Sequence, residues 1–294
     1  MSDLITPARR LRDMLASDEL VVAPGAFSPI VARQIEEAGF SAVYLTGAGI
    51  AAGIYGLPDT GQITMTEIVE AARNVVATIN IPVICDADCG FGNPLNVRRT
   101  VQHLEAAGVA AMHIEDQAFP KKCGFFEGHV LISIEDMVHR LNAARDARRD
   151  PDFMIIARIE SMGASGIEET LERAQAYVEA GADMTFVNGV TSEADAVRIG
   201  EEVPGLKLYN VSTSGQTPHL HEDKIRELGY SLAIYPAHTL FFALHGIREM
   251  LDDLKQKHTI APWLDRMIDF TEWKRVTGVP EVEAMERRYG SNDE

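Results

Sequence analysis

The sequence predicts an α/β fold, namely a closed (β/α)8 barrel of the TIM type that ends in a C-terminal helical extension. Short β-rich runs alternate with amphipathic helical patterns along the whole of the 294 residues. Eight such runs are present, the number that closes a barrel of this type. A doubly wound open sheet would more often carry a glycine-rich phosphate turn after its first strand, and the segment APGAFS there is not one.

Each strand is predicted by a short run that is rich in apolar and β-branched residues. In chain order these runs span residues 20–26, 42–48, 82–88, 110–116, 153–160, 183–189, 206–212 and 230–236. The clearest helical patterns between them span residues 64–80, 94–108, 166–181 and 221–229. In the third of these, Leu171, Ala174, Tyr177 and Val178 recur at helical spacing.

The segment that follows the eighth predicted strand is longer than a single helix requires. We therefore predict a catalytic barrel over residues 1–258 and a C-terminal helical tail over residues 259–294. Trp263 and Trp273 give this tail large apolar side chains. Their presence indicates that the tail covers another surface, such as that of a neighbouring subunit.

Composition restricts the class of partner and the compartment. The formal net charge of -17 argues against a nucleic-acid partner, but not against a small anionic substrate. No run approaches the roughly 18 apolar residues of a membrane span, so we expect no membrane partner. Cys85, Cys89 and Cys123 are too few and too irregular for a disulfide framework, which favours a reducing compartment, the cytoplasm.

Acidic residues gather where two neighbouring strands end. Asp86 and Asp88 end the third run, and Glu115 and Asp116 end the fourth. In such barrels the active site forms at these strand ends, where unpaired carboxylates would repel one another. Mg²⁺ or Mn²⁺ would resolve the conflict, and the spacing of Asp86 and Asp88 would direct both to one side of a strand. The alternative is that single acids cap helices or pair with lysine.

The remaining candidates follow the other strand ends. They are Tyr44, Thr46, Gly47 and Ala48 on the second run, Arg158 and Glu160 on the fifth, Asn188 on the sixth, and Asn210 and Ser212 on the seventh. An arginine there could bind a substrate carboxylate or only neutralise an acid, and the asparagines could instead cap helices. For His113, a core position is as plausible as a site position, and His238 stays open. Buried structural thiols are the better interpretation of Cys85 and Cys89.

A long loop over residues 117–132 follows the fourth strand, and long loops at this end of a barrel tend to be lids. Gly124 and Gly128 would let it move. Lys121 and Lys122 would lower the pKa of Cys123 and attract an anion. We therefore interpret Cys123 as a proton donor or acceptor that closure of the lid brings to the site. The alternative is that it is an ordinary surface cysteine.

Together these motifs resemble the isocitrate lyase and phosphoenolpyruvate mutase superfamily, and above all its short carbon–carbon lyases, 2-methylisocitrate lyase and 2,3-dimethylmalate lyase. The motifs are YLTGAGIAAGIYGLPDTG, DADCGFGNPLNVRRTV, HIEDQAFPKKCG, IARIES and LYNVS, and the resemblance covers most of the chain. It implies a barrel whose eighth helix is exchanged with a partner, in a homodimer or homotetramer. It also implies a Mg²⁺-dependent carbon–carbon lyase that cleaves a substituted 2-hydroxy di- or tricarboxylate to a 2-oxo acid, such as pyruvate, and a carboxylate.

The resemblance also implies roles for single residues. Asp86, Asp88 and Glu115 would hold the metal, and Asp59 would reach it through water. Cys123, Arg158, Lys121 and Glu115 would be the catalytic residues, with Cys123 protonating the departing carbon. Tyr44, Thr46, Gly47, Ala48, Asp59, Gly124, Arg158, Asn188, Asn210 and Ser212 would bind the substrate.

The chain departs from the family pattern at three positions. Phe125 replaces a histidine after the lid cysteine, and His129 follows only later. Glu160 and Asn188 stand where the lyases commonly carry aspartate and glutamate. Cleavage of oxaloacetate by hydrolysis or decarboxylation is therefore the leading alternative. Phosphorus–carbon chemistry of the phosphonopyruvate type and a non-catalytic barrel follow it.

Overall fold

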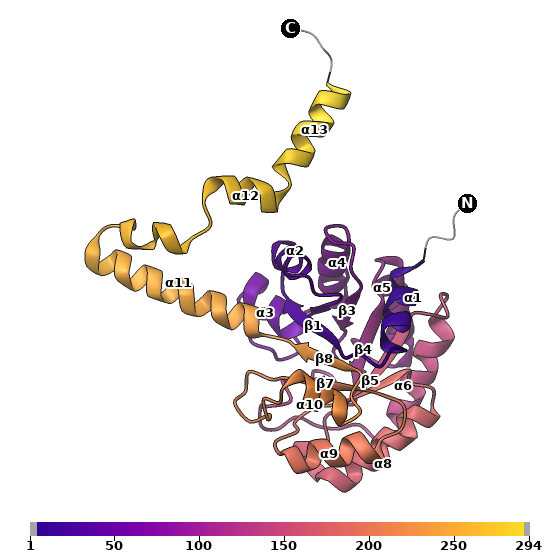
Figure 1. The fold of residues 1–294 in the computed structure, drawn as a ribbon. Coiled ribbons are helices and arrows are strands. Elements are labelled where there is room, and N and C mark those ends of the chain that lie inside the picture. The colour runs from indigo at the N-terminus through magenta and orange to yellow at the C-terminus, as the bar shows by residue number, and fades with distance from the viewer. Residues whose placement is uncertain (1–4, 291–294) are drawn as a thin grey trace. The chain divides into compact units, whose positions relative to one another are not determined.

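The computed structural model describes residues 5–290 and confirms the closed barrel (Figure 1). The eight parallel strands are β1 (Val21–Ala26), β2 (Val43–Leu45), β3 (Val83–Asp86), β4 (Ala111–Glu115), β5 (Met154–Ile159), β6 (Met184–Val187), β7 (Leu206–Asn210) and β8 (Leu232–Tyr235). Each lies within the range that the sequence predicts. Pairing of β1 with β8, in the register Val21 to Leu232, closes the barrel.

α1 (Pro7–Leu15) precedes β1, and further helices follow the strands and lie around the barrel (Figure 1). They are α2 (Pro29–Glu37), α3 (Gly47–Tyr55), α4 (Met65–Val76), α5 (Pro94–Ala106), α6 (Ile134–Ala147), α7 (Met162–Ser165), α8 (Ile167–Glu179), α9 (Glu193–Glu202) and α10 (Glu222–Glu227). After β8 the chain continues into α11 (His238–Lys257). Capping side chains determine where several of these helices begin. Thr64 and Glu67 form a reciprocal capping box at α4, and the Asn93 side chain accepts from the backbone at the start of α5.

Most strand residues are buried, because parallel strands have one face inside the barrel and the other against helices. Inside the barrel, the ring of His113 stacks on Tyr44 with 5.7 Å between centroids and meets the edge of Phe186 at 5.4 Å. His113 is fully buried. These three side chains fill the interior next to Asp86, at the end of β3.

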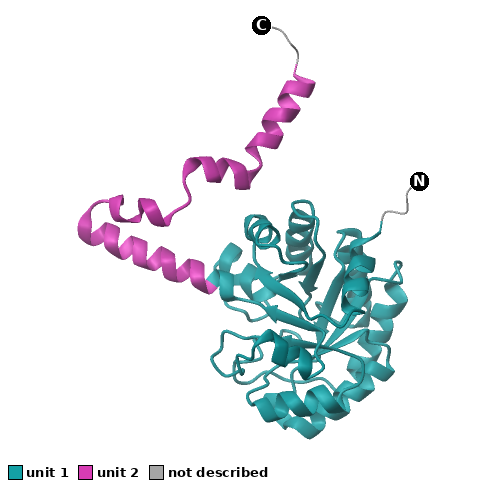
Figure 2. Ribbon diagram, in the orientation of Figure 1, with its two compact units in different colours: residues 1–240 teal, residues 241–294 magenta. Residues whose placement is uncertain are grey.

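The chain forms two compact units, residues 1–240 and 241–294 (Figure 2). Most of α11 thus belongs to the second unit, which continues with a 3-10 helix (Ala261–Arg266), α12 (Phe270–Thr277) and α13 (Val279–Tyr289). The expected helical extension is therefore present, although the units divide earlier than the boundary at residue 258. Within residues 5–290, no helix has both the length and the apolar character needed to cross a membrane.

Candidate active site

The carboxylates at the ends of β3 and β4 lie close together, but not in the way the sequence suggests. Asp86 ends β3, whereas Asp88 follows the strand in the left-handed region with φ 48°. The prediction that strand alternation directs both to one side was therefore wrong. A turn does this instead, in which the Asp88 backbone N–H donates to Asp86 Oδ1 at 3.0 Å.

The prediction that Asp116 belongs to the cluster of acids at the mouth of the barrel, where the strands end, was also wrong. Its Oδ2 accepts from Arg173 Nη1 at 3.0 Å and from the Tyr177 hydroxyl at 2.9 Å, both on α8. Its Oδ1 accepts from the Glu160 backbone N–H at 2.9 Å. Asp116 thus fixes the end of β5 against the helical layer.

The loop after β2 brings backbone N–H groups to the carboxylates. Thr46 caps α3 through its hydroxyl, and the Gly47 N–H lies 3.3 Å from Asp86 Oδ2. A Cβ on Gly47 would lie only 2.9 Å from that oxygen, so glycine is what allows this approach. Because α3 begins at Gly47, the positive end of its dipole faces Asp86 and any anion beside it. Ala48 is the second residue of this turn.

Tyr44 and His113 form a polar pair beneath Asp86. The Tyr44 hydroxyl lies 2.7 Å from His113 Nε2, and that nitrogen lies 3.6 Å from Asp86 Oδ1. Burial lowers the pKa of His113 to about 4 even though Asp86 opposes this, so the ring is neutral at pH 7. The pair connects the core to the mouth of the barrel.

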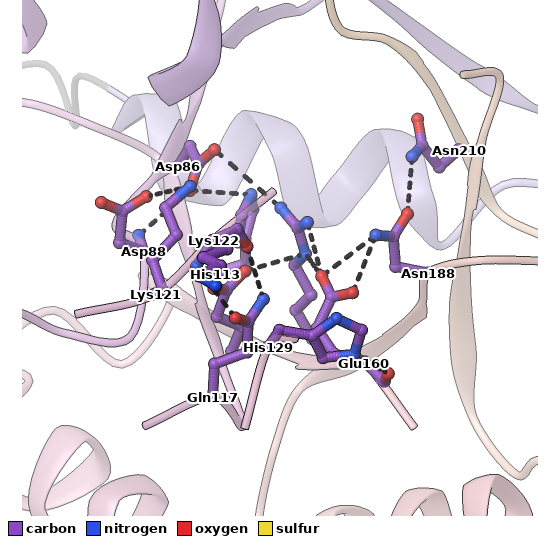
Figure 3. A network of polar contacts seen from close by, with 12 residues as sticks. Asp86, Asp88, His113, Gln117, Lys121, Lys122, His129, Glu160, Asn188 and Asn210 are labelled. Atoms are coloured by element: carbon purple, nitrogen blue, oxygen red, sulfur yellow. Dashed lines mark hydrogen bonds and ion pairs between the residues drawn. The ribbon is translucent and has the colours of Figure 1, made fainter. Parts of the chain in front are cut away.

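The loop after β4 contacts the residues at the strand ends, and Figure 3 shows Lys121 of this loop beside Asp88. Lys121 is only 2% exposed, and its Nζ lies 2.5 Å from Asp59 Oδ1 and 2.9 Å from Asp88 Oδ1. The Cys123 N–H donates to the Asp59 carbonyl at 3.0 Å. At the base of the loop, the side chain of Gln117 bonds the backbone of Lys122 in both directions.

The thiol of Cys123 does not have the lowered pKa that the neighbouring lysines suggested. Burial raises its pKa, and the charge of Asp59 adds to this, while Lys121 and Arg158 only partly oppose it. Lys122 is exposed. The thiol therefore stays protonated at neutral pH, which suits a proton donor and not a thiolate nucleophile. Cys85 and Cys89 are buried, as predicted.

A chain of polar contacts crosses from β5 to β7 (Figure 3). Arg158 binds Glu160 Oε1 at 2.5 Å, and Asn188 Nδ2 donates to both Glu160 oxygens at 3.0 Å. Asn210 Nδ2 donates in turn to Asn188 Oδ1 at 2.9 Å. The asparagines thus orient Glu160 and do not cap helices. Ser212 accepts from the backbone of its own turn.

His238, which the sequence left open, begins α11 at the end of β8. Its ring centroid lies 5.3 Å from that of Tyr235 and 6.4 Å from that of His219. Burial lowers the pKa of His238. This aromatic group lies outside the network of carboxylates.

Acids outnumber bases at the mouth. Lys121 and Arg158 face the carboxylates of Asp59, Asp86, Asp88, Glu115 and Glu160. Burial, reinforced by Asp86 and Asp59, raises the pKa of Asp88 to about 6 despite Lys121. Burial also raises the pKa of Glu115, whose two oxygens have no hydrogen-bond partner among the described residues, although Arg158 Nε lies 3.2 Å from Oε2.

Carboxylate oxygens are the ligand type that a hard divalent cation prefers, and those of Glu115 accept no hydrogen bond from the described residues and could serve one. Among residues 5–290, however, no three His, Cys, Asp or Glu side chains already converge around a single ion position. Mg²⁺ usually keeps several of its waters. The donor set of Asp86, Asp88 and Glu115 therefore fits an ion that is held partly through water.

Comparison with known proteins identifies the family. Residues 11–255 match the family model of phosphoenolpyruvate phosphomutase. The chain is 42% identical over 284 residues to 2,3-dimethylmalate lyase of Eubacterium barkeri, covering 97% of this chain and 98% of that one. It is 45% identical over 254 residues to a probable 2-methylisocitrate lyase of Corynebacterium glutamicum, covering 86% and 83%.

Solved structures of known proteins also superpose closely on this chain. Oxaloacetate acetylhydrolase in complex with 3,3-difluorooxalacetate superposes with a TM-score of 0.93 at 30% identity, over 99% of both chains. The crystal structure of 2,3-dimethylmalate lyase superposes with a TM-score of 0.91 at 34% identity, over 99% of this chain and 97% of that one. The chain belongs to the phosphoenolpyruvate mutase/isocitrate lyase superfamily. Within it, the chain is a carbon–carbon lyase.

Proposed function

We propose that the protein is a Mg²⁺-dependent lyase, with Mn²⁺ as a substitute, that cleaves a substituted 2-hydroxy di- or tricarboxylate. The products are a 2-oxo acid, such as pyruvate, and a carboxylate. The observation that carries this proposal is the excess of buried carboxylates over cations beneath a lid that holds Cys123. Such a mouth needs a cation before it can take an anionic substrate. A structure of phosphonopyruvate hydrolase in complex with oxalate and Mg²⁺, with a TM-score of 0.86 at 32% identity, supports the choice of metal.

Asp86, Asp88 and Glu115 would hold the metal, and Asp59 would reach its water shell from the lid side. When bound, Mg²⁺ would polarise the 2-hydroxy carboxylate and offset the negative charge on it. The N–H groups at the start of α3, at Gly47 and Ala48, would face the substrate carboxylate.

The chain's own groups then move the protons. A carboxylate of the mouth accepts the 2-hydroxyl proton while the C2–C3 bond breaks, leaving its electron pair on C3 and a carbonyl at C2. The Cys123 thiol donates its proton to C3, which forms a C–H bond there and leaves a thiolate on Cys123. Arg158 offers donors to the carboxylate oxygens, while the closed lid keeps water from the carbanion.

Cleavage of oxaloacetate is the second candidate, because of the fold match to oxaloacetate acetylhydrolase. The partly buried thiol of Cys123 favours the lyase, since hydrolysis or decarboxylation has less need of a proton donor in the lid. The buried acids that contact Arg158 argue against a non-catalytic barrel.

We further propose that α11 is exchanged between subunits of a homodimer or homotetramer. Along α11 and in the segment after it, many large apolar side chains are exposed: Phe241, Phe242, Leu244, Ile247, Leu251, Leu264, Ile268, Phe270, Trp273 and Tyr289. Apolar exposure on this scale marks an interaction surface. Light scattering after size-exclusion chromatography should give a mass of at least twice 32.3 kDa; a monomer would contradict the proposal.

The three free cysteines fit a cytoplasmic protein.

The deciding experiment measures release of 2-oxo acid from 3-alkylmalates and tricarboxylates with Mg²⁺, with oxaloacetate as a parallel substrate. Cys123→Ser is assayed beside the unchanged enzyme. Turnover of an alkylmalate that falls at least 100-fold in the serine variant would support the lyase. Turnover of oxaloacetate alone, equal in both proteins, would overturn it.

Binding of the metal has a test that is independent of turnover. Oxalate with Mg²⁺, at 100 times its Kd, should stabilise the fold by about 2.7 kcal/mol. For a barrel of this size that is a rise in melting temperature of roughly 5–10 °C. Oxalate without Mg²⁺ serves as the control.

A further inference from the structure

Arg140 is a buried arginine of α6 that forms no ion pair with any carboxylate among residues 5–290. It is only 8% exposed. Its Nη1 donates instead to two backbone carbonyls, that of Cys89 at 3.2 Å and that of Gln117 at 3.1 Å. A buried cation without an anion is costly unless hydrogen bonds compensate it. The two carbonyls that compensate Arg140 belong to two segments of the candidate active site.

The first segment is the turn after β3, residues 87–92, whose backbone is strained. Asp88 has a φ of 48° and Phe91 a φ of 61°, in the left-handed region that side chains other than glycine rarely adopt. Such a conformation persists only where the surrounding structure holds it. Arg140 holds this turn at the carbonyl of Cys89, the residue next to Asp88. Because Cys89 is fully buried, bulk water does not replace this bond.

The second segment is the start of the lid. Arg140 holds the carbonyl of Gln117, and the side chain of Gln117 bonds the backbone of Lys122 in both directions, at 2.8 and 3.0 Å (Figure 3). Lys122 stands between Lys121 and Cys123 in the chain. The contacts of Arg140 and Gln117 therefore help to set the positions of both neighbours.

The two segments meet a second time at the mouth of the barrel. There Lys121 Nζ, from the lid, lies 2.9 Å from Asp88 Oδ1, from the turn. Arg140 thus joins the two segments from behind, and the ion pair joins them in front. Loss of the guanidinium would leave two buried carbonyls without this donor, and the resulting desolvation penalty would drive the segments to rearrange.

We propose that Arg140 is a positioning residue of the active site. It holds the turn that carries Asp88 and the lid that carries Lys121 and Cys123 in one register, so that the metal ligand and the proton donor face the same substrate. The inference rests on the proposed lyase function. It adds to that function a residue that acts through the backbone of its neighbours.

Arg140→Met keeps an apolar stem, removes the donor, and tests the proposal without turnover. Two quantities are measured: the Kd of Mg²⁺, by calorimetry in the presence of oxalate, and the rate at which iodoacetamide alkylates Cys123, located by peptide mass. The variant should bind Mg²⁺ about tenfold more weakly, as for other residues that orient a metal ligand. Cys123 should be alkylated roughly fivefold faster, because a thiol that becomes more exposed ionises more readily.

Two control variants locate the effect. Gln117→Leu breaks only the contacts with Lys122, so it should speed alkylation of Cys123 without weakening Mg²⁺ binding; weaker Mg²⁺ binding in this variant would overturn the role of Arg140 at the turn. Asp183→Ala is the control for stability, because Asp183 precedes β6 at the opposite end of the barrel. It should leave both quantities within about twofold of the unchanged enzyme, since distant sites act independently.

Arg140→Lys covers the case in which the methionine variant does not fold. The ammonium keeps the charge but ends one bond short of Nη1, so Mg²⁺ should bind about threefold more weakly and alkylation should be faster. In that case the lysine variant decides alone, and values equal to those of the unchanged enzyme overturn the proposal. All measurements are made at a temperature at which each variant is folded.

The outcomes separate this role from the proposed function. If Arg140→Met unfolds more easily but keeps both quantities, Arg140 only stabilises the fold and the proposal is overturned. A change in one quantity alone overturns the claim that Arg140 joins the two segments. If both change but the unchanged enzyme releases no 2-oxo acid from any malate, the lyase is overturned and the positioning role stands. If the unchanged enzyme does not bind Mg²⁺, the proposed metal site and the role of Arg140 beside it are both overturned.

Discussion

Replacement of Gly124 by alanine tests whether the lid must rest on Glu160 during catalysis. The added Cβ would lie 2.0 Å from Glu160 Oε2, and real Cβ contacts are essentially never below 3.0 Å. Glu160 cannot retreat easily, because Arg158 binds it at 2.5 Å and Asn188 at 3.0 Å, and it is 3% exposed. The lid must therefore rise by about 1 Å, the difference between the two distances.

That displacement sets the expected magnitude. Cys123 is the neighbour of Gly124, so its thiol moves with the lid backbone. A misplacement of about 1 Å in a catalytic arrangement can cost around 100-fold in rate. This factor corresponds to about 2.7 kcal/mol of transition-state stabilisation. Stability should change by less than about 1 kcal/mol, because the loop contributes little to the core.

The assay compares kcat and KM for release of 2-oxo acid from 3-methylmalate, together with thermal unfolding. Gly163→Ala is the control, because a Cβ there meets no heavy atom within 4 Å, and it should stay within about twofold of the unchanged enzyme. A Gly124→Ala variant with unchanged kcat would refute the argument. It would mean that the contact between lid and Glu160 is not needed in the transition state.

Three other predictions concern charge and protonation. Asp183→Ala removes the acceptor of Arg12 Nη2 at 2.6 Å and Arg148 Nη1 at 2.8 Å, and should cost about 3 kcal/mol in denaturant unfolding; a loss below about 1 kcal/mol would show that these arginines find other partners. Because burial raises the pKa of Cys123, the donor stays protonated to higher pH than an exposed thiol, so kcat for cleavage should stay flat through pH 8 and fall only above the raised pKa. A fall that begins below pH 8, measured in a full pH profile, would contradict that assignment. Glu115→Gln should abolish the rise in melting temperature that Mg²⁺ and oxalate produce, since the carboxylate without a hydrogen-bond partner is lost; an unchanged rise would exclude Glu115 as a ligand.

The strands were predictable because a parallel barrel buries both faces of each strand, which leaves a short apolar run in the sequence. Their ends then located Asp86, Glu115 and Arg158 at one mouth. This inference needs only the rule that parallel strands end on the same side. It requires no knowledge of side-chain conformation.

The features that could not be predicted depend on the backbone conformation and on the three-dimensional packing. Asp88 adopts a positive φ that alternation along a strand cannot anticipate. Asp116 resembles the other acids in sequence, and only the packing of α8 shows that Arg173 engages it. The raised pKa of Cys123 likewise follows from burial under a closed loop, which residue spacing does not reveal.

Lys121 shows how lid position and charge depend on each other. In the closed lid its Nζ contacts Asp59 and Asp88, so closing the lid brings one positive charge to a mouth with too many acids. A buried lysine is costly unless it is paired. The contacts of Lys121 with Asp59 and Asp88 supply that pairing and therefore stabilise the lid in this position over the strand ends.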